Sequence, residues 1–189
     1  MTATTATTAT TAIPPATEST GGAIGNALLR LRDALGQRAG WGRSTASAVA
    51  TLGDGLRCQT VERAAVTASD LPTAFGGEAS APTPAALVRA ALANCLVLGY
   101  RLRAAELGVE LTSVRVTVES ESDVRGMLDP TAGVAAGFTA LRYHVEVDSP
   151  APAAEIHHLV ELADHLSPVL DMLTRAHAIE RTVSIRQEA

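Results

Sequence analysis

Cysteine, histidine and serine side chains are the residues of this sequence whose types and spacing could do chemistry. The two cysteines, Cys58 and Cys95, are too few for the disulfide framework of a small secreted protein. Cys95 lies in the apolar run ALANCLVLGY, where a cysteine is by default a small core residue. A reactive thiol needs a cation, a helix N-terminus or a metal close by. Because Cys95 comes eleven residues after Pro84, any activating group must come from another segment or another subunit.

A second group of polar residues lies near the C-terminus. His157, Glu161 and His165 are spaced four apart, which can suit zinc. They lie opposite the apolar stripe of their predicted helix, so a solvated face is favoured and no metal is expected. Ser167 follows His165 by two residues, which is poor geometry for a serine–histidine pair on a helix. We predict that Ser167 is the N-cap of the next helix, and that His165 could line a pocket beside it.

The element that must position Cys95 is a helix predicted over residues 84–107. Thr83 is a good N-cap, Pro84 suits the first helical position and Gly108 is a fitting C-terminal stop. Since this segment is apolar on nearly all sides, we expect it to be buried on nearly all sides. Its 24 residues would span about 36 Å, so it is predicted to be central and could be shared with a second subunit.

The remaining patterns predict an α+β fold with a mainly antiparallel sheet. Residues 1–22 are interpreted as a disordered Thr/Ala-rich tail, residues 23–40 as an amphipathic helix, and residues 44–189 as one domain. The domain is expected to contain two or three strands in 44–70, a long antiparallel pair from LTSVRVTVES and TALRYHVEVDS, a helix pair in AAEIHHLVELADHLSPVLDMLTRA and a last strand at 179–185.

Composition and charge argue against several classes of protein. The formal net charge is -5, so the sequence indicates no basic face, which argues against nucleic acid and anionic membrane as partners. No stretch of 18 uninterrupted apolar residues exists, and a transmembrane helix is therefore not expected. The N-terminal tail lacks the features of a signal peptide, and two cysteines fit a reducing cytoplasm. No cofactor is expected.

Several ordered segments resemble the OsmC/Ohr family. The stretch GGEASAPTPAALVRAALANCLVLGYRLRAAELGVELTSVRVTVE resembles its Gly-rich loop, its Pro-initiated helix with a cysteine about eleven residues on, and its alternating strand. DVRG at 123–126 and LADHLSPVLDML at 162–173 are also similar to family segments. The resemblance covers roughly residues 45–186. It implies an intertwined homodimer in which two sheets wrap two long central helices and the active sites lie at the interface.

Many members of this family reduce organic hydroperoxides with a thiol, which implies that Cys95 is the peroxide-attacking cysteine. In such members a sulfenic acid forms, a second cysteine closes a disulfide, and a dithiol resets it. Here Ser167 stands where that second cysteine should be, and Ala85 stands where a glutamate usually follows the proline. In the turn TLGDGLRC no arginine lies between the two glycines, so Arg57, just after them, and Arg63 are the neighbouring candidates for the activating cation.

Three interpretations follow from these departures. In the first, Cys95 is a one-cysteine peroxidase whose sulfenic acid is reduced by an external thiol. In the second, Cys58 pairs with Cys95 in place of the missing cysteine, although packing is the expected role of Cys58. In the third, the protein is a diverged member that binds a small apolar ligand in the interface pocket or performs other thiol chemistry.

Overall fold

The computed structural model describes residues 18–38 and 40–187 of the chain, so most of the predicted tail, residues 1–17, lies outside the described part. The elements follow in the order α1 (Glu18–Gln37), β1 (Val49–Leu52), β2 (Cys58–Glu62), β3 (Ala65–Ser69), the short 3-10 helix η1 (Thr73–Phe75), α2 (Pro84–Leu107), β4 (Ser113–Ser122), α3 (Arg125–Leu128), β5 (Phe138–Asp148), α4 (Ala153–His165) and α5 (Pro168–Thr174).

Helix α2 begins and ends where its local sequence predicts. The Thr83 hydroxyl accepts a hydrogen bond from the backbone N–H of Ala86 at 3.1 Å, and Pro84 occupies the first turn. Gly108 ends the helix with a φ of 70°, a left-handed conformation that costs glycine little. The predicted bounds of this helix are therefore confirmed.

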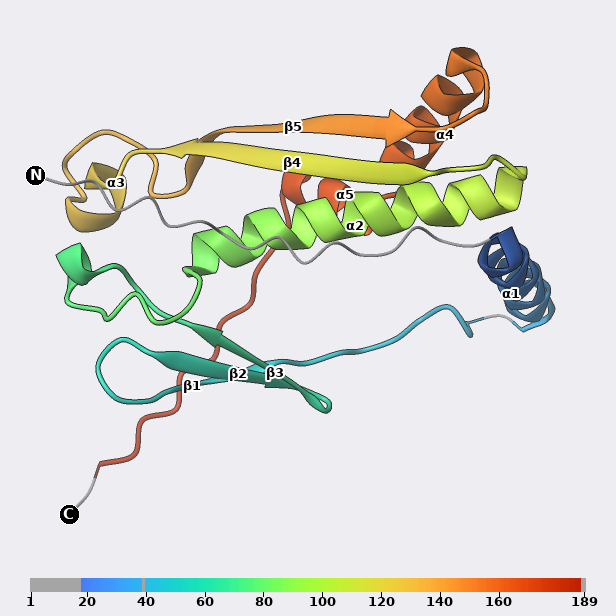
Figure 1. The fold of residues 1–189 in the computed structure, drawn as a ribbon. Helices are drawn as coiled ribbons and strands as arrows, with labels where there is room; N and C mark the ends of the chain where they lie inside the picture. The colour runs from blue at the N-terminus through green and yellow to red at the C-terminus, as the bar shows by residue number, and fades with distance from the viewer. Residues whose placement is uncertain (1–17, 39, 188–189) are drawn as a thin grey trace, which may run out of the picture.

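Two antiparallel sheets lie on different sides of α2 (Figure 1). The first is the three-stranded sheet β1–β2–β3. The second is the pair β4–β5, whose register runs from Ser113 opposite Asp148 to Ser122 opposite Phe138. The helices α4 and α5 follow this pair in the chain and pack on α2. This arrangement confirms the predicted α+β class with antiparallel sheets about a long central helix.

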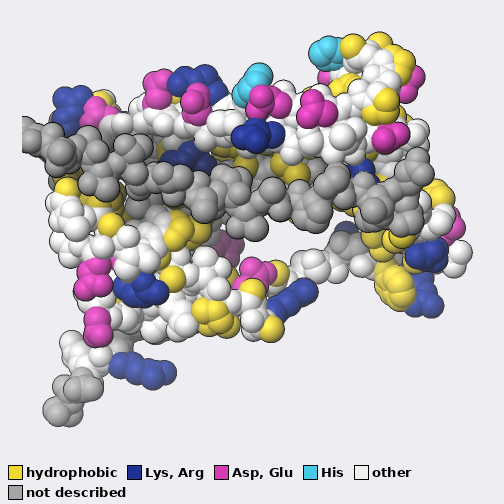
Figure 2. Space-filling model, in the orientation of Figure 1, with side chains coloured by type: hydrophobic (Ala, Val, Ile, Leu, Met, Phe, Trp, Pro, Cys, Tyr) yellow, Lys and Arg dark blue, Asp and Glu magenta, His cyan; other side chains and the backbone are white. Residues whose placement is uncertain are grey.

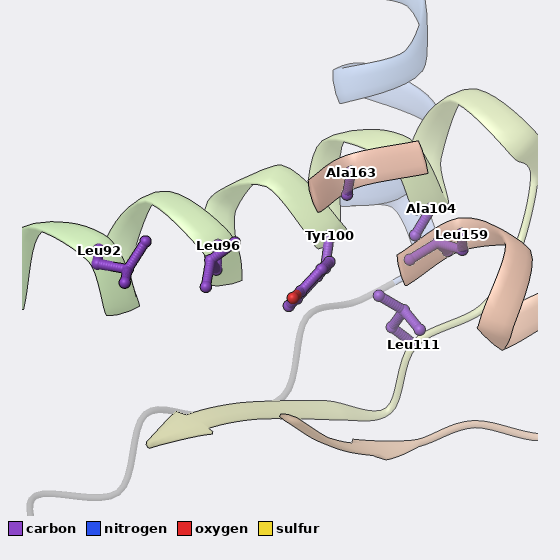
Figure 3. Packing of buried hydrophobic residues seen from close by; sticks show 7 residues of the cluster. All are labelled: Leu92, Leu96, Tyr100, Ala104, Leu111, Leu159 and Ala163. Carbon is purple, nitrogen blue, oxygen red and sulfur yellow. The ribbon is translucent and has the colours of Figure 1, made fainter. Parts of the chain in front are cut away.

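The hydrophobic core lies between α2, α4 and the β4–β5 pair. One stripe of α2 supplies a buried side chain at every fourth position, and Leu159 and Ala163 of α4 pack on it (Figure 3). Alternate residues of the two strands face the same core, as the alternation of the sequence predicts. The buried members of this cluster are Leu92, Leu96, Tyr100, Ala104, Leu111, Leu159 and Ala163.

The rest of the α2 surface is not covered within one chain. Leu98 is 63% exposed, and Val88 and Leu102 are also exposed. The three-stranded sheet has no buried residue, and Figure 2 shows hydrophobic side chains at the surface over it and over α1. The expectation that α2 is buried on nearly all sides is therefore wrong for a single chain, because only one of its stripes is fully buried and much of the remaining surface is open.

Two elements predicted near the ends of the chain also differ from those in the structure. Helix α1 begins at Glu18, inside the segment interpreted as tail, and ends at Gln37 rather than at residue 40. The expected last strand at 179–185 is extended backbone without a ladder partner, and Ile179 is 90% exposed. A strand needs a neighbouring edge to satisfy its backbone groups, and this segment pairs with no strand in the described chain.

Helix α2 is also long and apolar enough, by length and composition alone, to cross a membrane, with a mean hydropathy of 1.4. Core helices pass the same test, and one stripe of α2 packs against β4 and α4, although only 17% of the tested window is buried within the chain.

Candidate active site around Cys95

The candidate site is formed by the side chains of Cys95 and Ser167, which come from residues 72 positions apart in the chain. The Cys95 Sγ atom lies 3.3 Å from the Ser167 Oγ atom, close enough for a hydrogen bond that involves sulfur. Cys95 is half-buried, whereas Ser167 is only 3% exposed. The thiol is therefore at the boundary between the core and the surface, next to a buried hydroxyl.

Packing of α4 on α2 brings these two side chains together. Gly99 of α2 faces Ala163 of α4, so closely that a Cβ at Gly99 would lie 3.9 Å from the Ala163 Cβ. Four residues from this contact, Cys95 lies one turn earlier on α2, and Ser167 lies just beyond the end of α4, at the start of α5. Because four residues make about one helical turn, small residues at the crossing set the approach of the thiol and the hydroxyl.

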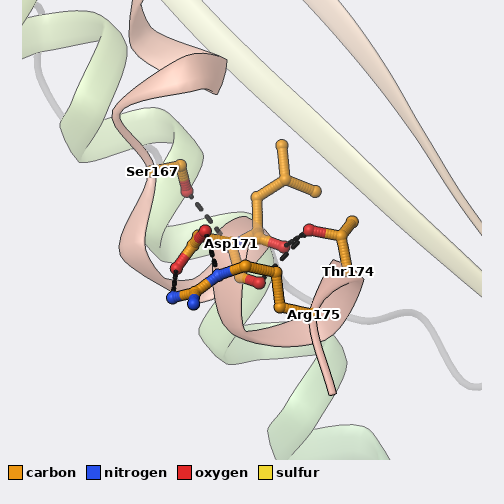
Figure 4. Close-up of polar contacts among 5 residues, drawn as sticks. Ser167, Asp171, Thr174 and Arg175 are labelled. Carbon is orange, nitrogen blue, oxygen red and sulfur yellow. Dashed lines mark hydrogen bonds and ion pairs between the residues drawn. The ribbon is translucent and has the colours of Figure 1, made fainter. Parts of the chain in front are cut away.

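Ser167 is the N-cap of α5, as the sequence predicts. Its Oγ atom accepts the backbone N–H of Leu170 at 3.4 Å. The turn that follows is held by further contacts, in which Thr174 donates to the Leu170 carbonyl and Arg175 pairs with Asp171 (Figure 4). Since the Ser167 oxygen accepts from the backbone, its own proton is available for donation to the Cys95 sulfur. The family resemblance identified the position of Ser167, but the sequence did not predict that its hydroxyl could donate to the Cys95 sulfur.

A second polar cluster is formed by side chains of α2, α4 and β5. The Tyr100 hydroxyl donates to Asp164 Oδ1 at 2.7 Å, and the Tyr143 hydroxyl donates to Asp164 Oδ2 at 2.8 Å. Burial and the hydrogen bond to Asp164 raise the pKa of Tyr100 above its usual range. The same two causes raise the pKa of Tyr143 to about 12. This cluster was not predicted, although a tyrosine within an apolar helix signals that its hydroxyl needs a buried partner.

The two candidate activating arginines lie at the three-stranded sheet. Neither of them forms a hydrogen bond with Cys95 in the structure. Arg57 donates from Nη1 to Ser80 Oγ at 2.5 Å, and this serine hydroxyl donates to Asp70 Oδ2 at 2.9 Å. Arg63 lies in the turn between β2 and β3 with a φ of 53°. Of the two, Arg57 is the one that is tied to the loop leading into α2.

The loop before α2 is organised by the buried carboxylate of Asp70, which is 2% exposed. It accepts backbone N–H groups from Leu71 at 2.7 Å, Ser80 at 2.9 Å and Glu78 at 3.2 Å. These hydrogen bonds, that of the Ser80 backbone first, lower the pKa of Asp70 below its ordinary value of 3.8. Asp70 therefore fixes the segment that joins the three-stranded sheet to the helix of Cys95.

The remaining predicted site residues do not join the pair. Cys58 is half-buried on β2 opposite Leu52 and Ser69, and both cysteines are free thiols, so no Cys58–Cys95 disulfide is present. His165 is exposed rather than lining a pocket with Ser167. His157 and Glu161 are exposed as well, and among the described residues no group of three acidic, histidine or cysteine side chains could hold a metal.

Comparison with known proteins gives this geometry a context. A sequence model of the family described as "OsmC-like protein" matches residues 77–182, which is more than half of the chain. The matched segment contains α2, α4 and α5, and hence both Cys95 and Ser167. A comparison with the curated proteins gave no match.

Solved structures share the fold at low sequence identity. An OsmC-like protein from Mycoplasma pneumoniae is 19% identical with a TM-score of 0.59, covering 69% of this chain and 87% of that one. An organic hydroperoxide resistance protein from Legionella pneumophila is 23% identical with a TM-score of 0.52, covering 69% and 90%. An OsmC-like protein of unknown function from Vibrio cholerae is 13% identical with a TM-score of 0.55, covering 70% and 95%.

Proposed function

This chain belongs to the OsmC-like protein family, and on that basis we propose that it reduces organic hydroperoxides with the Cys95 thiol and an external thiol reductant. The observation that carries the proposal is the 3.3 Å contact between Cys95 Sγ and Ser167 Oγ. Either atom can donate in this contact while Cys95 is a thiol, but a thiolate, which is the attacking form, can only accept, and the Ser167 hydroxyl is then placed to donate to it. The structural neighbour from Legionella pneumophila, an organic hydroperoxide resistance protein, supports the substrate class.

The proposed reaction is balanced without a second cysteine. The Cys95 thiolate attacks the hydroperoxide, an S–O bond forms, and the O–O bond breaks. The sulfur loses two electrons and becomes a sulfenic acid, while the other oxygen takes up a proton and leaves as an alcohol. One external thiol then forms a mixed disulfide with release of water, and a second external thiol restores the Cys95 thiol and leaves as its own disulfide.

The external reductant follows from the residues around the sulfur. Ser167 is the side chain in contact with Cys95, and a hydroxyl cannot form a disulfide. Cys58 lies on the three-stranded sheet, with which the Cys95 pair makes no hydrogen bond. A reducing compartment such as the cytoplasm would supply the small thiols that this cycle needs.

We also propose that the working form is a homodimer with Cys95 at the interface. Val88, Ala91, Cys95, Leu98 and Leu102 follow the spacing of one helical stripe, and this stripe is largely open in the single chain. An apolar stripe of this length on a central helix calls for a covering surface. The three-stranded sheet has unpaired edges, and the extended segment 179–185 pairs with no strand of its own chain. A second subunit could supply the missing backbone partners of both.

The proposed activity is tested with cumene hydroperoxide and dithiothreitol. The wild-type protein and Cys58→Ser should consume the hydroperoxide, whereas Cys95→Ser should not. One equivalent of hydroperoxide without reductant should add one oxygen atom to the peptide that contains Cys95, and dimedone should trap it as the sulfenic acid. A Cys95 that stays unmodified under these conditions would refute the proposal and favour a diverged member that binds a small apolar ligand.

A further inference from the structure

The carboxylate of Asp164 joins three elements of the fold at one point. Tyr100 reaches it from α2 and Tyr143 reaches it from β5, each donating to a different oxygen atom. Asp164 itself lies in the last turn of α4. Tyr100 is completely buried, so its hydroxyl would lose a hydrogen bond at considerable cost without this acceptor. The end of α4 is therefore fixed both to the helix of Cys95 and to the sheet.

Only one tight turn separates this carboxylate from the residue that touches Cys95. The backbone N–H of Ser167 donates to the Asp164 carbonyl at 3.1 Å, and the N–H of Leu166 donates to the carbonyls of Leu162 and Ala163 at 3.2 Å each. These bonds leave the turn little freedom. A shift of Asp164 would therefore move the Ser167 hydroxyl relative to the Cys95 sulfur.

We propose that Asp164, held by Tyr100 and Tyr143, is a positioning residue that sets the hydrogen bond from Ser167 to Cys95. The inference rests on the proposed function, because the hydrogen bond matters when the sulfur must react as a thiolate. Asp164 does not touch the sulfur. It acts by holding the turn between α4 and α5, so that the Ser167 proton points at Cys95 while the Ser167 oxygen accepts from Leu170.

The geometry supports this role over packing alone. Two phenol hydroxyls meet the two oxygens of one carboxylate, and this match fixes the direction as well as the distance of the contact. Hydrophobic side chains at the same places could fill the volume but would not fix the rotation of α4 about its axis. A thiol–hydroxyl contact of 3.3 Å depends on that rotation.

The test uses the full-length chain in a Cys58→Ser background, so that Cys95 is the only thiol. Iodoacetamide alkylation is followed by mass spectrometry across pH in the absence of any peroxide. Ser167→Ala should slow alkylation at neutral pH by roughly tenfold, because the hydroxyl that can donate to the reacting sulfur is lost. Tyr100→Phe should act in the same direction, and Tyr143→Phe should do so more weakly.

The decisive comparison is the double variant Tyr100→Phe with Ser167→Ala. If Asp164 acts through Ser167, this variant should be no slower than Ser167→Ala alone, whereas additive losses would overturn the proposal. Thr174→Val is the matched control, because it removes a hydroxyl of α5 that bonds only to backbone carbonyls. Should Tyr100→Phe fail to fold, the cycle of Tyr143→Phe with Ser167→Ala gives the same decision at a more exposed position.

These outcomes are independent of the peroxidase test. Non-additive losses of alkylation rate together with no hydroperoxide consumption would support the positioning role and refute the proposed activity. Additive losses of alkylation rate together with intact, Cys95-dependent hydroperoxide consumption would refute the positioning role and support the proposed activity.

Discussion

The Sγ atom of Cys95 and the Oγ atom of Ser167 lie 3.3 Å apart, although α2 carries one residue and the start of α5 carries the other. The pair combines a half-buried thiol with a buried hydroxyl whose oxygen already accepts a backbone N–H. The Ser167 hydroxyl can donate a hydrogen bond to the Cys95 sulfur, but it cannot form a disulfide with it. Both properties lead to predictions that can be measured.

The first prediction is that Ser167→Cys creates an internal disulfide with Cys95 on oxidation. The two side-chain atoms are already in contact, so a small adjustment would bring two sulfur atoms to bonding distance. Peptide mapping under non-reducing conditions should identify the linkage after one equivalent of hydroperoxide. Thr174→Cys on the same helix is the control, and it should leave Cys95 unlinked. Absence of the bond in Ser167→Cys would contradict the geometry of the site.

The second prediction concerns the two tyrosines, which are the only ones in the chain. Absorbance of phenolate should be absent near pH 10, because the pKa of Tyr143 is raised to about 12 and that of Tyr100 is raised further. Asp164→Asn should lower the pKa of Tyr143, since a carboxylate charge no longer opposes the phenolate. Glu119→Gln removes an exposed carboxylate of β4 and should leave the titration unchanged.

The same shifts make stability depend on alkaline pH. Both tyrosines have a folded pKa above the unfolded value of 10, so their contribution to the free energy of unfolding is complete below pH 10 and is lost as the pH rises through the folded values. Circular dichroism recorded during the titration should therefore show unfolding that accompanies phenolate formation. Phenolate formation near pH 10 in the folded protein would rule out the buried cluster.

The third prediction concerns Asp70 and acid. Its folded pKa lies below the ordinary value of 3.8, so its contribution to stability is present above that value and is lost as the pH falls through the folded pKa. Asp70→Asn should therefore lower the free energy of unfolding at pH 7, and the difference from wild type should shrink in acid. Denaturant titrations at both pH values measure this. Asp54→Asn, an exposed change in the turn after β1, should show no such pattern.

The fourth prediction concerns the crossing of α1 on α2. A Cβ at Gly25 would lie 2.8 Å from the Ala105 carbonyl oxygen, and this backbone atom belongs to the central helix. Gly25→Ala should therefore cost about 1–3 kcal/mol of stability, measured by denaturant unfolding. Gly22→Ala is the matched control, because nothing lies within 4 Å of its Cβ position and alanine favours the helix. Equal effects of the two changes would argue against the close crossing.

The fifth prediction tests the proposed dimer. Leu98 is 63% exposed on the open stripe of α2, so Leu98→Glu should shift the protein towards monomer in sedimentation velocity runs. Leu128→Glu alters an equally exposed residue of α3, away from this stripe, and should leave the dimer intact. A wild-type protein that sediments as a monomer would refute the dimer directly.

The sequence by itself determined the elements whose signals are local. Thr83, Pro84 and Gly108 set the ends of α2, because capping depends on residues next to each other in the chain. Strict alternation likewise located the β4–β5 pair. The resemblance to a known family also identified Cys95 and Ser167 as corresponding positions. The apolar pattern of α2 and of residues 179–185 indicated which side chains should be buried, but it did not indicate which surface covers them.

Only the tertiary structure decided the polar contacts of the site. Cys95 meets Ser167 across 72 residues and Tyr100 meets Asp164 across 64 residues, so no local spacing encodes either pairing. Both depend on the rotation and translation of α4 on α2, which the small pair Gly99 and Ala163 allows. The chemistry of the thiol therefore depends on helix packing, a collective property of the folded chain that its residue pattern does not display.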